Sequence, residues 1–187
     1  MTSVQLQQVV KEYDSLDQVT LTGYKNPPAL REVSLEIQDG EIMCIVGPSG
    51  CGKSTLLKVV AGLEFPQRGR VFYNDFDMTV IKPQDRGVGM VFQDYALYPT
   101  MKGKGNLAYY FQQHEHTQEE MEARVRQTAA LMGVDFELLL GRTSETLSGG
   151  EQQRVAIARC IVRDPLVFLM DEPIVNLDAK QIGRAHV

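Results

Sequence analysis

The sequence predicts an α/β fold in which the strands of a largely parallel sheet alternate with crossover helices. Short apolar runs alternate along the chain with segments of helical periodicity, which is the order that connects parallel strands. Two runs, residues 42–46 and 166–170, are apolar throughout, as strands buried on both faces are. The length of 187 residues fits one domain, or one domain with a subdomain.

The expected strands differ in how much of each is buried. The run at residues 33–37 alternates apolar and polar residues, so one face of that strand is expected to be solvated. The full set of expected strands is residues 6–10, 33–37, 41–46, 69–73, 87–92 and 166–170.

The middle of the chain has a helical pattern. Thr117 and Glu120 have the spacing of a capping box, and Gly133 is a typical helix end. A second helix is expected over residues 150–162. It should end there because Pro165 disfavours helical backbone at the residue before it. We therefore expect a helical subdomain inserted between sheet strands.

Composition excludes several classes of protein. The net charge is −5, whereas nucleic-acid binding needs a basic face. No apolar run reaches the roughly 18 residues of a membrane span, and the N-terminus lacks a signal-peptide layout. The cysteines and histidines show no metal-ligand spacing, so we expect Cys44, Cys51 and Cys160 to be reduced thiols.

A glycine-rich loop after the run at 41–46 fits the phosphate-loop pattern G-x-x-x-x-G-K-[ST]. Its glycines would let backbone N–H groups surround phosphates, and the following helix adds its positive end. Lys53 is expected to reach the β- and γ-phosphates of a nucleotide, and Ser54 to bind Mg²⁺. Cys51 is expected to react with alkylating agents and to be protected by MgATP. The expected nucleotide site comprises Gly47, Pro48, Ser49, Gly50, Cys51, Gly52, Lys53, Ser54 and Thr55.

An acidic pair follows the last apolar run. Asp171 would complete the Mg²⁺ shell, and Glu172 would orient or deprotonate an attacking water. A solvated acidic turn is the alternative for such a pair. Together with the phosphate loop, the pair predicts a P-loop ATPase.

A third motif begins at Leu147. Ser148, Gly149 and Gly150 at a helix start would present a hydroxyl and N–H groups to an anion, as the phosphate loop does. This run resembles the signature motif of ATP-binding cassette (ABC) ATPases. The resemblance implies a homodimer or paired cassette, with ATP at the interface. In that dimer, Ser148 and Gly150 of one copy are expected to bind the γ-phosphate that Lys53 of the other copy holds.

The resemblance also implies a fold and further site residues. The fold is a P-loop NTPase core with a mixed and parallel sheet, an antiparallel β subdomain and the inserted helical subdomain. Gln93 matches the glutamine that contacts Mg²⁺ or the attacking water, and residues 176–178 match a loop at the dimer seam. Tyr13 matches the aromatic that stacks on adenine, with Tyr24 as an alternative.

Residues 83–93 and 95–101 are similar to ATPases of carbohydrate importers of the maltose and glycerol-phosphate type. The resemblance implies transmembrane permease subunits as partners, and a place at the cytoplasmic face of the cell membrane. Importers of iron, sulfate or polyamines remain alternatives, although such relatives tend to have phenylalanine where Tyr98 stands. An exporter is a further alternative. Residues 102–106 depart from the family pattern, so docking to the permease is expected to be altered.

Other proteins that carry such cassettes fit less well. The DNA-repair and chromosome-organising kind has a long coiled coil between the two motifs, and the 95 residues from Lys53 to Ser148 leave no room for one. The translation-factor kind needs two cassettes. A non-catalytic nucleotide-binding module would not need Lys53, Asp171 and Glu172 together.

The end of the sequence is expected to be foreign. Residues 182–187 can be encoded by a common sequencing-library adapter, so we expect them to be translated adapter on a truncated gene. His186 lies 15 residues after Asp171 and is not assigned as the family's switch histidine. We therefore expect weak MgATP binding and slow hydrolysis, or a nucleotide-binding fragment without hydrolysis. The expected division is a nucleotide-binding core (1–93), a helical signature subdomain (94–163), a return to the core (164–181) and the tail (182–187).

Overall fold

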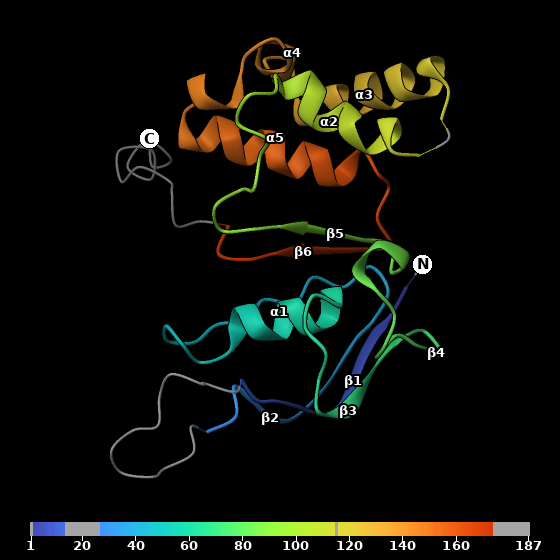
Figure 1. Ribbon diagram of the computed structural model, residues 1–187, viewed down its shortest axis with the longest axis vertical. Coiled ribbons are helices and arrows are strands. Elements are labelled where there is room, and N and C mark those ends of the chain that lie inside the picture. Colours follow the sequence, from blue (N-terminus) through green and yellow to red (C-terminus); the bar gives the residue numbers. More distant parts are fainter. Residues whose placement is uncertain (1, 14–26, 115, 174–187) are drawn as a thin grey trace. The chain divides into compact units, whose positions relative to one another are not determined.

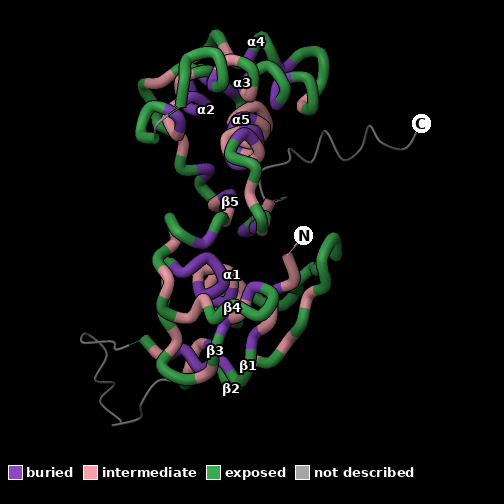
Figure 2. Tube along the Cα trace, turned by 90° about the vertical axis from the view of Figure 1, so that its right-hand side faces the viewer, coloured by how far each residue is buried: buried purple, intermediate pink, exposed green. Residues whose placement is uncertain are grey.

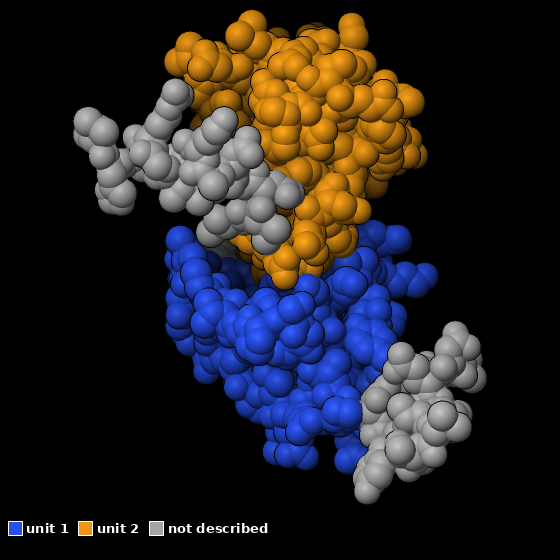
Figure 3. Space-filling view, turned by 90° about the vertical axis from the view of Figure 1, so that its left-hand side faces the viewer, with its two compact units in different colours: residues 1–88 blue, residues 89–187 orange. Residues whose placement is uncertain are grey.

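The computed structural model describes residues 2–13, 27–114 and 116–173. The chain forms two compact units, residues 1–88 and residues 89–187 (Figure 3). Several expectations lie outside the described residues: Tyr24, the loop at 176–178, and the tail at 182–187 with His186.

The first unit contains an antiparallel sheet in the order β2-β1-β3-β4 (Figure 1). Leu6 of β1 pairs with Leu35 on one side and Val71 on the other. The alternating sequence of β2 gives it one half-buried and one exposed face, as expected. The strands expected at 6–10, 33–37 and 69–73 are thus confirmed. The strand bounds are β1 (Val4–Lys11), β2 (Leu30–Ile37), β3 (Arg68–Tyr73) and β4 (Phe76–Asp77).

Helix α1 (Lys53–Ala61) completes the core of this unit. It ends at Gly62, whose left-handed φ of 76° lets the chain leave the helix. Figure 2 shows the buried stretches of α1 and of the strands in purple. The core residues include Leu6, Val9, Leu56, Val59, Val60, Val71 and Tyr73.

A buried arginine closes the C-terminal end of α1. Arg86 is 1% exposed and follows the short 3-10 helix η1 (Pro83–Asp85). Its Nη1 donates to the carbonyls of Val59 (3.0 Å) and Val60 (2.7 Å), and its Nε donates to the carbonyl of Ile81 (2.9 Å). A Cβ at Gly62 would lie 2.4 Å from that Nε, so only glycine fits there. Arg86 therefore satisfies the last carbonyls of α1, where a cation is also favoured by the helix dipole.

The second unit is mainly helical, and α5 runs through its core (Figure 1). The helix opened by Thr117 and closed by Gly133 is confirmed as α3, and Thr117 and Glu120 form the expected capping box. The helices of the second unit are α2 (Gly103–Gln112), α3 (Gln118–Met132), α4 (Phe136–Leu140) and α5 (Gly149–Ile161), with the 3-10 helix η2 (Ser144–Thr146). Core residues include Leu107, Phe111, Phe136, Leu147, Val155 and Val162.

Two strands, β5 (Val88–Val91) and β6 (Val167–Met170), pair with each other, and the helices α2 to α5 lie between them in the chain. Figure 1 shows both strands running in the same direction, so the helices form a crossover between parallel strands as expected. The strands expected at 87–92 and 166–170 are confirmed. The expected burial of the second on both faces is wrong: Leu169 is buried, but Phe168 and Met170 are 36% and 40% exposed, because β6 pairs with β5 in a sheet of two strands among the described residues. Among the helices described, none is long and apolar enough to cross a membrane.

The buried strand expected at residues 41–46 is wrong. This segment has no helix or strand, and Ile42 and Val46 are 90% and 89% exposed. An apolar run becomes a buried strand only if neighbouring strands accept its backbone bonds. In the part of the chain that the structure describes, β1 to β4 pair with one another and β5 pairs with β6.

Replacement of Arg86 by methionine is predicted to lower the free energy of unfolding by about 3 kcal/mol, because the carbonyls of Val59, Val60 and Ile81 each lose one charged donor. Urea unfolding measures this. The matched control is Arg70→Met, whose side chain is 67% exposed and whose loss should cost under about 0.5 kcal/mol. Equal losses for both variants would contradict the role given to Arg86.

Candidate functional site

The phosphate loop leads directly into α1. Residues 47–51 are exposed, and Gly50 and Gly52 have left-handed φ values of 78° and 97°. Such alternating backbone turns successive N–H groups toward one concave side, a geometry that binds anions. The Lys53 Nζ donates to the carbonyls of Gly47 and Pro48 at 3.0 Å each, so its charge lies across the loop. These residues fit a bound phosphate.

The N-terminus of α1 lacks the side-chain cap that α3 and α5 have, so its first N–H groups are more available to a ligand. Its N-cap residue, Gly52, has no side chain to accept from the helix, and no acidic residue stands in the described first turn. Both α3 and α5 have capping boxes that satisfy their first N–H groups. The positive end of α1 is thus not offset by a carboxylate of its own.

Tyr13 lies beside the start of α1. Its hydroxyl is 3.4 Å from the Thr55 Oγ1, and the Lys11 Nζ lies 5.1 Å from the centre of its ring. The ring is 48% exposed, which leaves a face for a stacked base. Tyr13 therefore lies where a base stacked on its ring would be next to the start of α1, and adenine stacking on Tyr13 is a proposal.

The second unit holds Gln93, Asp171 and Glu172 at the ends of β5 and β6. Gln93 follows β5, and Asp171 follows β6. The Asp171 N–H donates to the carbonyl of Val91 at 3.0 Å, so these two strand ends meet at one edge. Asp171 is 7% exposed, and Glu172 has left-handed backbone with φ 48°. A non-glycine residue in that region costs about 1–3 kcal/mol and often marks a functional site.

Mg²⁺ in proteins usually keeps waters and is shared between one or two carboxylates and substrate phosphates. Within the described ranges, no group of three or more His, Cys, Asp or Glu side chains could hold a metal ion. The donors expected for Mg²⁺, namely Ser54, Gln93 and Asp171, are a hydroxyl, an amide and a carboxylate, and such oxygen ligands are of the kind that Mg²⁺ binds. Ser54 lies in the first unit, and Gln93 and Asp171 lie in the second.

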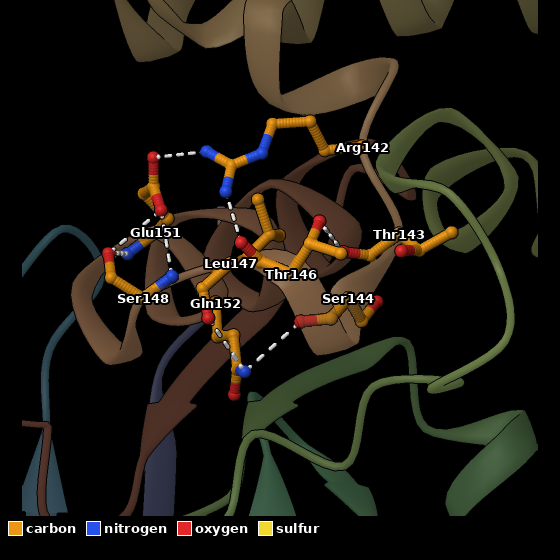
Figure 4. A network of polar contacts seen from close by, with 8 residues as sticks. All are labelled: Arg142, Thr143, Ser144, Thr146, Leu147, Ser148, Glu151 and Gln152. Carbon is orange, nitrogen blue, oxygen red and sulfur yellow. Dashed lines mark hydrogen bonds and ion pairs between the residues drawn. The ribbon is translucent and has the colours of Figure 1, made fainter.

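The third motif forms the start of α5 and the turn before it (Figure 4). Ser148 is the N-cap, with Gly149 as the first helical residue. The Glu151 Oε2 accepts from the Ser148 N–H (2.7 Å) and hydroxyl (2.8 Å). These bonds hold the pKa of Glu151 below its usual value, and Arg142 adds to the effect. Ser148 and Gly149 are exposed.

The chain matches the model of the family described as "ABC transporter" over residues 30–175. The chain belongs to the ABC transporter family. Its mixed α/β cassette fold, with an antiparallel sheet and a helical region, confirms the expected fold class.

Similar proteins include two ATP-binding subunits of importers. The sn-glycerol-3-phosphate import ATP-binding protein UgpC of Escherichia coli (strain K12) is 45% identical over 180 residues, which is 96% of this chain and 47% of that protein. UgpC of Yersinia enterocolitica is 44% identical over 180 residues, which is 96% of this chain and 46% of that protein. The chain thus spans about half the length of these relatives.

Two solved structures of the cassette MJ0796 are similar to this cassette. The dimeric structure of this bacterial ABC transporter cassette has a TM-score of 0.79 and 29% identity, and covers 97% of this chain and 78% of that one. The dimeric post-hydrolysis state bound to ADP and Pi has a TM-score of 0.77 and 31% identity, and covers 95% and 77%.

Three polar residues that tie the cassette's motifs together were not among the expected site residues. Arg159 of α5 donates to the carbonyls of Tyr95 (3.0 Å) and Ala96 (2.6 Å), two residues with left-handed backbone just after Gln93. Gln153 donates to the carbonyl of Pro173, beside Glu172. Arg142 pairs with Glu151. The polar residues after Gly150 were the available signal for Gln153 and Arg159, but the partners of these two are 20 and more than 60 positions away. Arg142 precedes that run, and its partner Glu151 is nine positions away.

Replacing Gly52 by alanine is predicted to destabilise the cassette more than replacing Gly50. A Cβ at position 52 would lie 2.5 Å from the carbonyl oxygen of Ala29, whereas one at position 50 meets nothing within 4 Å. Both changes put a side chain on left-handed backbone, at about 1 kcal/mol each, and the clash should add about 1–2 kcal/mol at position 52. Urea unfolding of both variants checks this, and equal losses would contradict it.

Proposed function

We propose that this cassette binds MgATP and hydrolyses it to ADP and phosphate, as the energy-supplying subunit of a solute importer. The observation that carries the proposal is the exposed loop before α1, with left-handed Gly50 and Gly52 and the Lys53 ammonium held across it. Anion binding at such a helix start is a general property of its backbone.

In the proposed reaction, a water oxygen attacks the γ-phosphorus as the bond between that phosphorus and the β,γ-bridging oxygen breaks. Glu172 orients the water and accepts its proton, and ADP leaves with the electron pair of the broken bond. Lys53 binds the β- and γ-phosphate oxygens. Ser54, Gln93 and Asp171 would hold Mg²⁺, which would supply positive charge to offset that of the phosphates. The meeting of the β5 and β6 ends supports a joint role for Gln93 and Asp171.

We further propose that two cassettes enclose ATP, with Ser148, Gly149 and Gly150 of one facing the phosphates bound by the other. The dimeric MJ0796 structures support this arrangement. The partners are transmembrane permease subunits, which hold the cassette at the cytoplasmic face of the membrane.

The proposed solute is a glycerol phosphate or another carbohydrate, since the UgpC relatives are sn-glycerol-3-phosphate import ATP-binding proteins. Import of another solute is the alternative. Transport assays with permeases encoded beside this gene, using glycerol phosphate, maltose, polyamine, iron and sulfate, would separate the two.

Lys53→Ala is predicted to weaken MgATP binding at least about tenfold, because one charged contact to phosphate is worth more than 1.4 kcal/mol. Glu172→Gln should keep binding within about twofold but lower turnover about 100-fold or more, since it removes a general base. Titration calorimetry and phosphate release measure the two effects.

Each variant tests a separate part of the proposal. Binding by the Lys53→Ala variant equal to that of the original chain would contradict the nucleotide site. Binding with no Glu172-dependent turnover would leave a nucleotide-binding module without hydrolysis, and the enzymatic part would be wrong.

Cysteine labelling tests the site without mutation. Cys44 and Cys51 are exposed, while Cys160 is buried, which raises the pKa of its thiol. Iodoacetamide should label Cys51, and MgATP should slow that labelling at least about tenfold if the loop encloses phosphate. Cys44 is the internal control, because it lies outside the loop. Mass mapping that shows equal slowing at both cysteines, or none at Cys51, would contradict the assignment.

A further inference from the structure

The hydroxyl of Ser148 is already engaged by the chain itself. It donates to the Glu151 Oε2 at 2.8 Å and accepts from the Glu151 N–H at 3.4 Å (Figure 4). If Ser148 is to donate to a phosphate, its hydroxyl must turn away from Glu151. That step leaves a carboxylate beside the incoming phosphates.

Two like charges in such proximity oppose binding, and the opposition grows as water is excluded from the interface. The Glu151 side chain is 29% exposed, so it is only partly solvated. Its pKa is held below the usual value, which keeps it ionised near neutral pH. The site proposed for a nucleotide thus contains an unfavourable charge that needs a counter-charge.

Arg142 supplies that counter-charge from the side away from Ser148. Its Nη1 lies 2.9 Å from the Glu151 Oε1, while Ser148 uses Oε2. Its Nη2 donates to the carbonyl of Thr146, which anchors the guanidinium to the turn before α5. Glu151 can therefore lose its bond to the Ser148 hydroxyl and still keep Arg142.

The capping box does not itself require an arginine. At α3, Thr117 and Glu120 make the same pair of backbone bonds (2.9 and 3.2 Å), and the side chain beside Glu120 is that of His116, whose Nδ1 lies 3.7 Å from the Glu120 Oε2. The turn before α5 is also held independently by Gln152, whose Nε2 donates to the carbonyls of Ser144 and Leu147 at 3.1 Å each. Arg142 is thus an addition specific to the start of α5.

We propose that Arg142 is a positioning residue: it neutralises Glu151 and retains its carboxylate when Ser148 turns to the γ-phosphate of ATP bound by a second copy of the chain. The inference rests on the proposed function, since it needs that second copy. It explains why a capping carboxylate can be tolerated at a phosphate-binding helix start.

The experiment is MgATP-driven dimerisation in a Glu172→Gln background, followed by analytical ultracentrifugation. Arg142→Gln should raise the dimer dissociation constant about tenfold, because it leaves Glu151 unneutralised at an interface. Glu151→Gln should lower it, since glutamine still forms a capping box without charge. The double variant should lie within about twofold of Glu151→Gln, since Arg142 then has no charge to neutralise.

The matched control is Arg126→Gln, which removes an exposed i,i+4 pair with Glu122 and should leave dimerisation unchanged. Thermal unfolding of every variant separates loss of fold from loss of dimer. If Arg142 only supports the turn, the double variant will stay as weak as Arg142→Gln, and this result overturns the proposal. An undiminished dimer in Arg142→Gln, or a chain that binds MgATP without dimerising, overturns it too. A chain that does not bind MgATP instead refutes the proposed function.

Discussion

The start of α1 is the constraint on which the rest of the first unit depends. The first N–H groups of any helix need acceptors, and here the N-cap is a glycine with no acidic residue in the described first turn. The Lys53 ammonium adds a second positive charge over the same loop. A helix start built in this way favours an external anion, because no carboxylate of its own competes for it.

The C-terminal end of α1 is held by hydrogen bonds from two side chains. Arg86 is buried against the last carbonyls of the helix, and Tyr73 donates to the carbonyl of Val60 at 2.7 Å. The core of this unit holds buried apolar side chains of both the helix and the antiparallel sheet. The start of α5 in the second unit differs from that of α1. There the Glu151 carboxylate accepts from the Ser148 N–H, and Arg142 offsets the charge of that carboxylate.

Much of this could be predicted from the sequence because its signals are local. The capping box of Thr117 and Glu120, the Gly-rich loop and the alternating strand at 33–37 depend on neighbours only a few residues away, and the structure has them as expected. The apolar run at 41–46 misled the prediction, because burial of a strand depends on partners elsewhere in the chain. Arg159 was missed because its partners are more than 60 positions away. Arg142 is only nine positions from Glu151, but no sequence motif links an arginine before the turn to the capping carboxylate after it.

The most direct measurement is a titration of glycine-labelled chain with MgATP, followed by ¹⁵N NMR of the amide signals. The account predicts that Gly50 and Gly52 shift together with one dissociation constant, since their N–H groups bind phosphate. Gly133, which closes α3, serves as the reference and should not move. Shifts confined to other glycines, with Gly50 and Gly52 unchanged at saturating MgATP, would contradict the central claim that the start of α1 binds the nucleotide.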